Sequence, residues 1–355
     1  MSDQSSLHEP SSSSVDYRTV VGDGLGAHVG YAELEALFDM HFDTIRRAQC
    51  SVSQPGLLTL AFDVGTASLA GKCWVKSRQD AISSMVVGRH RNCGLLLASD
   101  SAVSLRHLLV VTHPYTNGSA KLSFRTMDLR TSLGFRDCFS NQLQGLVSDG
   151  PGMLSVGRYA LVLLPTGVRP LSSSRREAWD HVADPVYLEQ QTQYTQASAS
   201  HSAASGDGEP RGRLGSDLDA GASRTAFTIV AGPQRAGAGL LDRNEGLLGT
   251  LTVSAHGRSQ ELLLGRRAAS QGVLLGSYDR CDDACLAHVD DSGISRVHVV
   301  VFLHENNLYA IDTASTNGCF AEQPGRRVKV RIAKLSPQFE LLLADDRARL
   351  HWEPE

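Results

Sequence analysis

The sequence lacks the features that direct a chain into a membrane, out of the cell or onto nucleic acid. No window approaches about 18 uninterrupted apolar residues, so we expect no membrane-spanning helix. The first 20 residues are polar and lack the apolar central region of a secretory signal. A formal net charge of -4 over 355 residues provides no bulk positive charge to attract nucleic acid. These absences predict a cytoplasmic protein that has neither a membrane nor a nucleic acid as partner.

Cysteines are few, and they do not form a disulfide framework. There are seven, an odd number, at irregular spacings, which suits a reducing cytosol. Cys281, Cys285 and His288 lie close together, and a zinc ion could use them, but no second pair of ligands stands at a familiar spacing. We therefore expect buried or surface thiols, no metal site and no cofactor.

Complete catalytic motifs are also missing. The run from Gly65 to Lys72 has one residue too many between its glycines for a phosphate loop, and Cys73 replaces the usual Ser or Thr. A β-hairpin turn explains this run better. No His-Glu-x-x-His zinc motif is present, and the 13 histidines cannot be grouped into a triad. The sequence therefore predicts a protein that is not an enzyme.

The length and the apolar content predict two domains and some unfolded chain. A chain of 355 residues favours two domains, and a hydrophobic share of 41% is slightly below that of a typical globular protein. Residues 1–28 are rich in Ser, Gly and Asp, and we expect a disordered tail there. Residues 190–224 carry almost no large apolar side chains and predict a flexible linker. A shorter linking segment is expected at 166–174.

Two helices are expected. Residues 29–50 form an amphipathic pattern in which apolar side chains recur every three to four positions: Tyr31, Leu34, Phe38, Phe42 and Ile45. We expect this helix to pack on its own neighbouring domain, and binding of a partner protein is the alternative. A second short helix is expected within 175–188, with an interruption at Pro185.

The rest of the chain reads as short β-strands separated by turn residues about every 8–12 positions. The runs are 57–62, 71–75, 83–88, 107–113, 121–128 and 158–165, followed by 249–254, 260–265, 272–276, 297–303, 307–312, 329–332, 339–343 and 348–352. They predict an all-β fold of two antiparallel β-sandwiches, at 55–166 and 225–353, joined by the flexible linker and preceded by the short N-terminal helix.

The two β regions repeat one ordered set of short motifs. In the first region the motifs are Gly88-Arg89, Ser104-Leu105-Arg106-His107 and Ser132-Leu133-Gly134. In the second region they are Gly276-Ser277, Ser295-Arg296-Val297-His298 and Thr316-Asn317-Gly318. In both regions the first motif ends a strand, the second opens another strand, and the third follows a further strand.

At these motifs the sequence resembles the forkhead-associated (FHA) domain family. That family has Gly-Arg at a strand end, Ser-x-x-His in a loop and a turn of the type Ser-x-Asn-Gly on a β-sandwich. The resemblance is strong for the second copy and moderate for the first, where the last turn is degraded. Members of the family read phosphothreonine peptides with loops at one end of the sandwich. The resemblance thus implies a non-catalytic adaptor that binds a phosphothreonine-containing protein, with a Ser/Thr protein kinase acting upstream.

The chemistry that the resemblance implies is reasonable on physical grounds. A phosphothreonine carries close to two negative charges and three acceptor oxygens, so its reader needs a guanidinium group together with hydroxyl and amide donors. A side-chain amide suits the peptide backbone, because it both donates and accepts hydrogen bonds.

Carried over residue by residue, the resemblance implies two imperfect sites. In the first copy Arg89, Ser104 and Ser132 match, but Leu133 replaces the Asn that holds the peptide backbone. In the second copy Ser277 replaces the phosphate-binding arginine, and Arg280, three residues on, is a candidate substitute. The other matching residues of the second site are Ser295, Arg296, Thr316 and Asn317. The residues implied to be structural are Gly88, His107, Gly134, Gly276, His298 and Gly318.

A second function remains open at this point. Degenerate recognition folds can persist as structural or assembly subunits, which would dock unphosphorylated protein partners through sheet faces or the 31–47 helix. Binding that depends on phosphorylation would distinguish the adaptor from the docking subunit.

Overall fold

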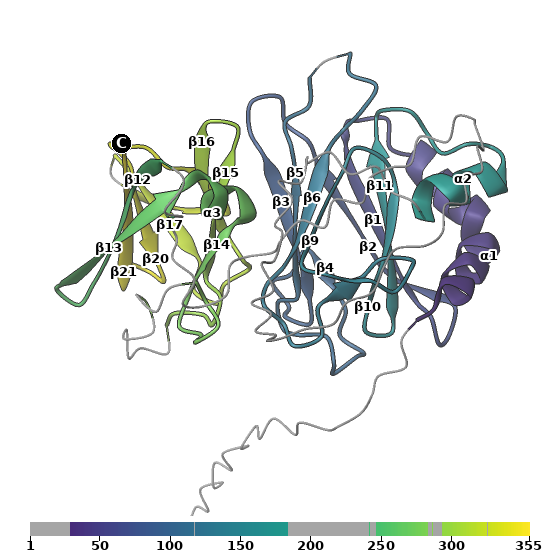
Figure 1. Ribbon diagram of the computed structural model, residues 1–355, viewed down its shortest axis with the longest axis horizontal. Coiled ribbons are helices and arrows are strands. Elements are labelled where there is room, and N and C mark those ends of the chain that lie inside the picture. Colours follow the sequence, from purple (N-terminus) through teal and green to yellow (C-terminus); the bar gives the residue numbers. More distant parts are fainter. Residues whose placement is uncertain are drawn as a thin grey trace, which may run out of the picture.

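The structure is a computed structural model that describes residues 29–116, 118–183, 241, 246–282, 286, 293–324 and 326–355. The predicted tail at 1–28, the predicted linker at 190–224 and Pro185 lie outside these residues. The described chain is mostly β-sheet, as the sequence predicts, and forms two antiparallel sandwiches with a short N-terminal helix (Figure 1).

The first sandwich consists of a six-stranded sheet in the order β2-β1-β11-β10-β7-β8 and a five-stranded sheet in the order β4-β3-β5-β6-β9. Its strands are β1 (Gly56–Asp63), β2 (Ser68–Lys76), β3 (Ser83–Gly88), β4 (Leu95–Leu96), β5 (Leu108–Thr112), β6 (Phe124–Asp128), β7 (Phe135–Arg136), β8 (Gln142–Leu143), β9 (Gly145–Ser148), β10 (Gly152–Val156) and β11 (Tyr159–Thr166).

The second sandwich consists of a six-stranded sheet in the order β13-β12-β21-β20-β17-β18 and a four-stranded sheet in the order β14-β15-β16-β19. Its elements are β12 (Leu247–Ala255), β13 (Arg258–Gly265), α3 (Arg266–Gln271), β14 (Val273–Leu275), β15 (Val299–His304), β16 (Asn307–Asp312), β17 (Cys319–Gln323), β18 (Arg326–Val330), β19 (Ile332–Lys334), β20 (Glu340–Leu343) and β21 (Ala348–Pro354). No helix was expected at the position of α3.

The two sandwiches share one topology. Strand for strand, the order β2-β1-β11-β10-β7-β8 corresponds to β13-β12-β21-β20-β17-β18, and β3-β5-β6-β9 corresponds to β14-β15-β16-β19. Among the strands of the described residues, β4, which pairs in parallel with the end of β3, is the one without a counterpart. The short motifs that repeat in the sequence therefore belong to a repeated fold.

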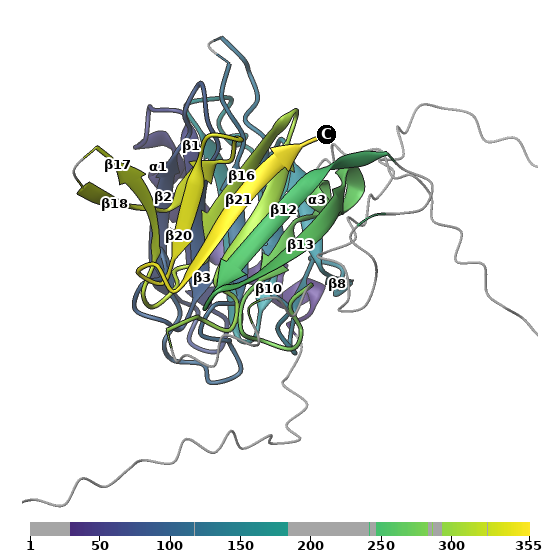
Figure 2. The same ribbon diagram turned by 90° about the vertical axis from the view of Figure 1, so that its left-hand side faces the viewer.

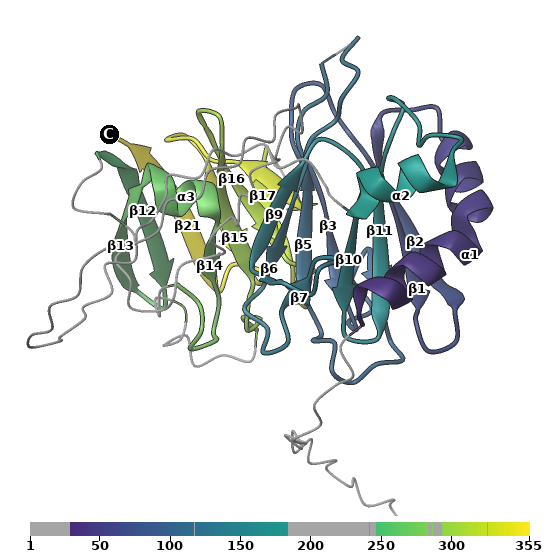
Figure 3. The same cartoon turned by 45° about the vertical axis from the view of Figure 1, so that its right-hand side comes forward.

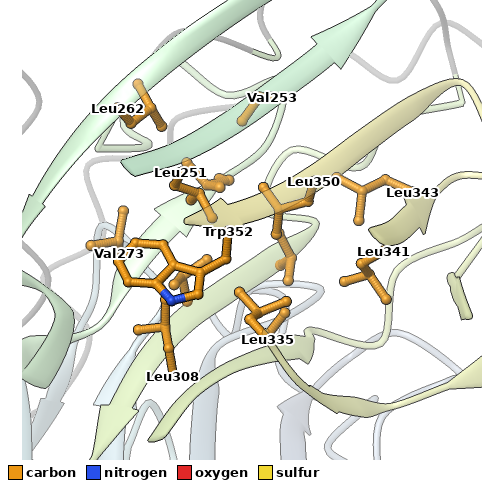
Figure 4. Packing of buried hydrophobic residues seen from close by; sticks show 14 of the residues in the cluster. Leu251, Val253, Leu262, Val273, Leu308, Leu335, Leu341, Leu343, Leu350 and Trp352 are labelled. Atoms are coloured by element: carbon orange, nitrogen blue, oxygen red, sulfur yellow. The ribbon is translucent and has the colours of Figure 1, made fainter. Parts of the chain in front are cut away.

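Each sandwich has its own apolar core between its two sheets. In the second sandwich Leu251, Trp352 and Leu350 from the larger sheet face Val273 and Leu308 from the smaller one (Figure 4). Buried aliphatic side chains of this kind contribute about 1.5–3 kcal/mol each relative to exposure. The alternation of buried and partly exposed residues along β12 and β21 shows that their sheet has one face on this core and one face toward solvent.

Helices cover the outer face of the larger sheet in the first sandwich. The helix α1 (Tyr31–Cys50) lies across β1 and β11, and the helix α2 (Arg175–Ala183) lies beside α1 and packs on β10 (Figure 3). The buried Gln49 fixes the end of α1, because its side chain donates to the carbonyl of Pro165 at 2.8 Å and accepts from the backbone N–H of Leu171 at 2.9 Å. The helix thus packs on its own domain, as expected. The 166–174 segment is packed against the first sandwich, since its own Leu171 is buried and donates its backbone N–H to Gln49.

The two sandwiches also pack against each other, face to face, through the sheets of β5 and β15. Along the long axis of the molecule, the layers are the helices, the two sheets of the first sandwich and the two sheets of the second (Figure 1). The outermost layer, the sheet of β12 and β21, is seen from its open side in Figure 2. The buried cluster between the sandwiches comprises Ile82, Val86, Leu109, Val111, Met127 and Leu129 on one side and Leu274, Cys281, Val297, Val300, Phe302, Tyr309 and Ile311 on the other.

Equivalent positions of the two copies meet in this interface. The strand registers make Val86 equivalent to Leu274 and Val111 equivalent to Phe302, and all four side chains are buried there. Two residues beyond Val111 and Phe302 the chain has a histidine in each copy, and the rings of His113 and His304 lie 4.4 Å apart between centroids. The same face of each copy is therefore used, as in an isologous dimer.

Candidate functional site

A buried histidine holds the Ser-x-x-His loop against the following turn in both copies. In the first copy, Nδ1 of His107 accepts the backbone N–H of Ser104 at 3.1 Å, and Nε2 donates to the carbonyl of Gly134 at 2.6 Å. In the second copy, His298 makes the same two bonds to Ser295 and Gly318, both at 3.1 Å. Burial lowers the pKa of both histidines, which keeps Nδ1 free to accept.

The glycine that opens the first motif is required by a close backbone approach. A Cβ at Gly88 would lie 2.4 Å from the carbonyl oxygen of Leu105, and a Cβ at Gly276 would lie 2.0 Å from that of Arg296. The backbone N–H groups of the next two residues bond to the same loop in each copy. These glycines thus bring the end of β3 or β14 directly beside the Ser-x-x-His loop.

The turn that carries the last motif is built by residues to which the sequence analysis gave no role. The carboxylate of Asp312 accepts the backbone N–H of Ser315 at 2.8 Å, and the Ser315 hydroxyl accepts that of Gly318 at 3.0 Å. Asp128, Thr131 and Gly134 repeat these contacts in the first copy. Each aspartate begins a motif Asp-x-x-Ser/Thr-x-x-Gly, and the repetition of this spacing in both copies is the sequence signal that could have identified these turn residues.

Three of the residues implied for the second site lie together, with Ser277 beside them. The Ser295 hydroxyl accepts the backbone N–H of Thr316 at 3.0 Å, and Nδ2 of Asn317 donates to the carbonyl of Gly293 at 2.8 Å. The Ser277 hydroxyl donates to the carbonyl of Ile294, next to Ser295, at 3.2 Å. Thr316 is exposed, so this end of the sandwich presents its hydroxyl to solvent.

Two arginines of the second copy occupy different environments. Arg296 is exposed and follows Ser295 directly. The guanidinium of Arg280 lies over the ring of Tyr278, 5.6 Å from its centroid, and the Arg280 carbonyl accepts from Arg130 of the first sandwich at 2.7 Å. The described contacts do not bring Arg280 to Ser295 or Thr316.

The residues implied for the first site are less closely joined. The backbone N–H of Arg89 donates to the carbonyl of Ser104 at 3.1 Å, and its Nε donates to the carbonyl of Val103. Ser132 is exposed in the following turn. Among the described residues, no hydrogen bond connects the side chains of Arg89, Ser104 and Ser132. Leu133 supplies no amide where Asn317 stands in the second copy.

Residues of the first sandwich reach into the turn of the second. Arg106 donates from Nε to the carbonyl of Ala314 at 2.9 Å and from Nη2 to the Thr316 hydroxyl at 3.3 Å. Asn92 donates to the carbonyl of Ser315, between those two residues, at 3.3 Å. Burial lowers the pKa of Arg106, and the nearby charge of Arg296 lowers it further. Positive charges from both sandwiches thus gather at Thr316.

A cavity of about 530 Å³ lies between the sandwiches beside this turn. Its lining includes the cationic side chains of Arg91, Lys329 and Arg331, together with Asp312 and Ser315. Lys329 also lies against the turn itself, since a Cβ at Gly318 would be 2.5 Å from Lys329 Cε. The surroundings of Thr316 are therefore suited to a ligand that carries negative charge.

Two further expectations concern metals and membranes. Cys285 and His288, which were considered for zinc, lie outside the described residues, and within those residues no group of three or more His, Cys, Asp or Glu side chains is placed to hold a metal ion. In the same part of the chain, no helix is long and apolar enough to cross a membrane.

Each β-sandwich brings its loops together at one end, where the Ser-x-x-His loop is held against the following turn. Residues 264–343 match the family model described as FHA domain, so the chain contains an FHA domain in its second sandwich. FHA domains are non-catalytic interaction modules that bind phosphothreonine. The first sandwich repeats the strand order of this domain.

Known proteins resemble single parts of the chain. No curated protein matches it. Among solved structures, FHA-1 of Rv1747 from Mycobacterium tuberculosis is 24% identical, with 30% of this chain and 97% of that chain covered and a TM-score of 0.23. The FHA domain of the CT664 protein from Chlamydia trachomatis is 15% identical, with 31% and 96% covered and a TM-score of 0.24. Mycobacterium tuberculosis EmbR, in complex with a low affinity phosphopeptide, is 13% identical, with 32% and 26% covered and a TM-score of 0.23.

Proposed function

We propose that this chain is a non-catalytic adaptor in Ser/Thr kinase signalling that binds phosphothreonine peptides through its second sandwich. The observation that carries the proposal is the gathering of Ser295, Thr316 and Asn317 at one end of the FHA domain. Its partner would be a protein phosphorylated on threonine by a Ser/Thr kinase. A cytoplasmic location belongs to the proposal, since the described cysteines are all free thiols.

The groups at this end match the needs of a phosphothreonine peptide. The hydroxyls of Ser295 and Thr316 can donate to phosphate oxygens, and the exposed Arg296 supplies positive charge. The side-chain oxygen of Asn317 can accept from a peptide N–H while its Nδ2 is held by Gly293. The ligand would lie across the turn without a change in the core of the sandwich.

We propose that the first sandwich serves mainly to support the second. Leu133 cannot hold a peptide backbone through a side-chain amide, and the exposed Leu105 stands where Arg296 stands in the second copy. Arg89 and Ser104 retain the chemistry for a phosphate but not for the register of a peptide.

The docking alternative has fewer surfaces available than the sequence suggested. The sheet faces of β5 and β15 cover each other, and the apolar face of α1 packs on the first sandwich. The docking of unphosphorylated partners would therefore have to use other surfaces.

Calorimetric titration of the full chain with phosphothreonine peptides selected from a library tests the proposal. We expect binding that disappears with the unphosphorylated form of the same peptide. Ser295→Ala should weaken it about tenfold or more, because a hydrogen bond to a charged group contributes about 1.5–3 kcal/mol. Asn317→Ala should weaken it about two- to tenfold, because it removes a neutral hydrogen bond to the peptide backbone, which contributes about 0.5–1.5 kcal/mol. Ser132→Ala, in the first copy, is the matched control and should change the affinity less than twofold. Equal binding of both peptide forms would refute phosphate recognition.

A further inference from the structure

The second copy lacks an arginine at the position where the first copy has one. Arg89 directly follows Gly88, whereas Ser277 follows Gly276. The Ser277 hydroxyl is occupied by the carbonyl of Ile294. A hydroxyl at this position carries no charge and cannot form the two parallel bonds that a guanidinium makes to a phosphate. On its own, the second sandwich therefore has an incomplete phosphate site.

Arg106 brings a guanidinium group to this site from the first sandwich. Its Nη2 lies 3.3 Å from the hydroxyl of Thr316, and the backbone N–H of Thr316 in turn bonds to the Ser295 hydroxyl. Its Nε is fixed by the carbonyl of Ala314 at 2.9 Å, so the side chain is held in place before any ligand arrives. A group that is already positioned loses little conformational entropy when it binds.

The repeated fold does not by itself require an arginine at this position. The equivalent residue of the second copy, directly before the histidine, is Val297, which is buried among apolar side chains of the interface. A Ser-x-x-His loop is thus built equally well with an apolar residue here. The structure of the loop therefore does not explain why a charged residue stands at position 106.

The charges around Thr316 provide that reason. Arg106 and Arg296 approach each other closely enough that the charge of Arg296 lowers the pKa of Arg106. Lys329 adds a third cation beside Gly318. Asp312 opposes this effect, since its charge raises the pKa of Arg106 by more than that of Arg296 lowers it, and its carboxylate also accepts the backbone N–H of Ser315. An anion at Thr316 would relieve the repulsion between the two guanidinium groups.

We propose that Arg106 of the first sandwich supplies the phosphate-binding guanidinium that Ser277 does not supply, so that the two sandwiches together form one composite phosphothreonine site. This inference rests on the proposed function, and it assigns a different part of the binding site to each sandwich. The second sandwich provides the hydroxyls and the peptide-holding amide, and the first provides the fixed charge.

Calorimetric titration of full-length variants with the phosphothreonine peptide found for the wild type tests the composite site. Arg106→Ala and Arg106→Gln should each weaken binding about tenfold or more. Arg106→Lys should give an intermediate loss, because a lysine keeps the charge but not the fork. Asn92→Ala is the matched control, since it removes a neighbouring bond between the sandwiches without removing charge, and it should change affinity less than twofold.

A rescue experiment separates a ligand-binding arginine from a merely structural one. The double variant Arg106→Gln with Ser277→Arg should regain most of the lost affinity, because it restores a guanidinium within the second copy. Thermal unfolding of each variant shows whether the fold is kept. If Arg106→Ala is unstable, Arg106→Gln is used for the titration.

The outcomes distinguish this inference from the proposed function. A wild-type chain that binds no phosphothreonine peptide refutes the function itself. A wild type that binds, with Arg106→Gln binding equally well, overturns only the composite site. Equal losses in Arg106→Gln and Asn92→Ala, without rescue by Ser277→Arg, would likewise overturn it, because they would show that Arg106 acts only by holding the interface.

Discussion

The ion pair between Arg130 and Asp282 offers a direct test of how the two sandwiches are joined. Arg130 belongs to the first sandwich and Asp282 to the second, and their side chains are 11% and 1% exposed. Asp282 also accepts the backbone N–H of Leu274 at 2.7 Å. Burial lowers the pKa of Arg130, and the nearby Asp282 opposes this shift.

Replacement of one partner should be costly, whereas replacement of both should be less costly than the sum. Arg130→Met leaves a buried carboxylate without its cation, and breaking a buried pair costs about 3–5 kcal/mol. Because Asp282 keeps its bond to Leu274, we expect a loss near the lower value, about 3 kcal/mol. Asp282→Asn should cost about 1–3 kcal/mol. The double variant should be more stable than the sum predicts by about 1–3 kcal/mol.

Urea unfolding followed by tryptophan fluorescence provides the assay, since Trp74 and Trp179 report on the first sandwich and Trp352 on the second. The exposed pair Arg176–Glu35, whose side chains are 72% and 31% exposed, is the control and should couple by no more than about 1 kcal/mol. Additive effects of Arg130→Met and Asp282→Asn, within about 0.5 kcal/mol, would refute the packing of the two sandwiches described here.

Two further predictions concern buried histidines. His298→Ala leaves the buried backbone N–H of Ser295 without its acceptor, whereas the carbonyl of Gly318 still accepts the backbone N–H of Ala344. The variant should lower the free energy of unfolding by about 1–3 kcal/mol and weaken phosphopeptide binding. Thermal unfolding together with calorimetry checks both, and an unchanged affinity would contradict the bracing role. Burial, with the charges of His304 and Arg125 nearby, lowers the pKa of His113 to about 3, below its value of about 6.5 in the unfolded chain. The folded state therefore favours neutral His113, so its contribution to stability is complete above about pH 6.5 and is lost as the pH falls toward 3. Burial raises the pKa of Asp128 to about 6, so this carboxyl changes stability with pH in the opposite direction. The assay therefore compares the urea midpoints of the wild type with those of His113→Gln from pH 7 to pH 4. The midpoints of His113→Gln should depend less steeply on pH, and parallel curves for the two proteins would rule out the contribution of His113.

Local patterns in the sequence were sufficient for most strands of the two sandwiches. The run 307–312 is the strand β16, and 83–88 is β3. Short or irregular strands such as β7 and β8 were missed, because two residues carry no periodicity. The single run expected at 329–332 is divided between β18 and β19, which pair with β17 and β16 in different sheets. A bend of this kind depends on tertiary pairing.

The interface between the sandwiches left a signal that the sequence analysis did not use. Every residue of β5 is buried, as are five of the six in β15, because these strands are covered on both faces. Their sequences, LLVVT and VVVFLH, are almost continuously apolar where a strand with one exposed face would alternate. An unbroken apolar run in an antiparallel sandwich thus indicates a second packing partner, but it does not identify that partner.

The motif residues of the second site could be located from the sequence because they lie on loops whose spacing the fold fixes. Ser295, Thr316 and Asn317 are held by contacts to their own copy. Arg106 could not be assigned in this way, because its contacts with Ala314 and Thr316 cross more than two hundred residues of chain. Only the packing of the two copies places it there.

The face-to-face packing of equivalent surfaces has a consequence for how the two halves can change. In a homodimer every substitution occurs twice, at positions related by the axis, so an arginine that suits one side must also be tolerated on the other. With both copies in one chain, the position of Arg106 can be occupied by Val297 in the second copy, and that of Arg130 by Ala314, so neither arginine is duplicated. The pairing also holds at any protein concentration, because the partner is always attached. Covalent linkage thus turns a symmetric contact into one whose two sides are free to specialise.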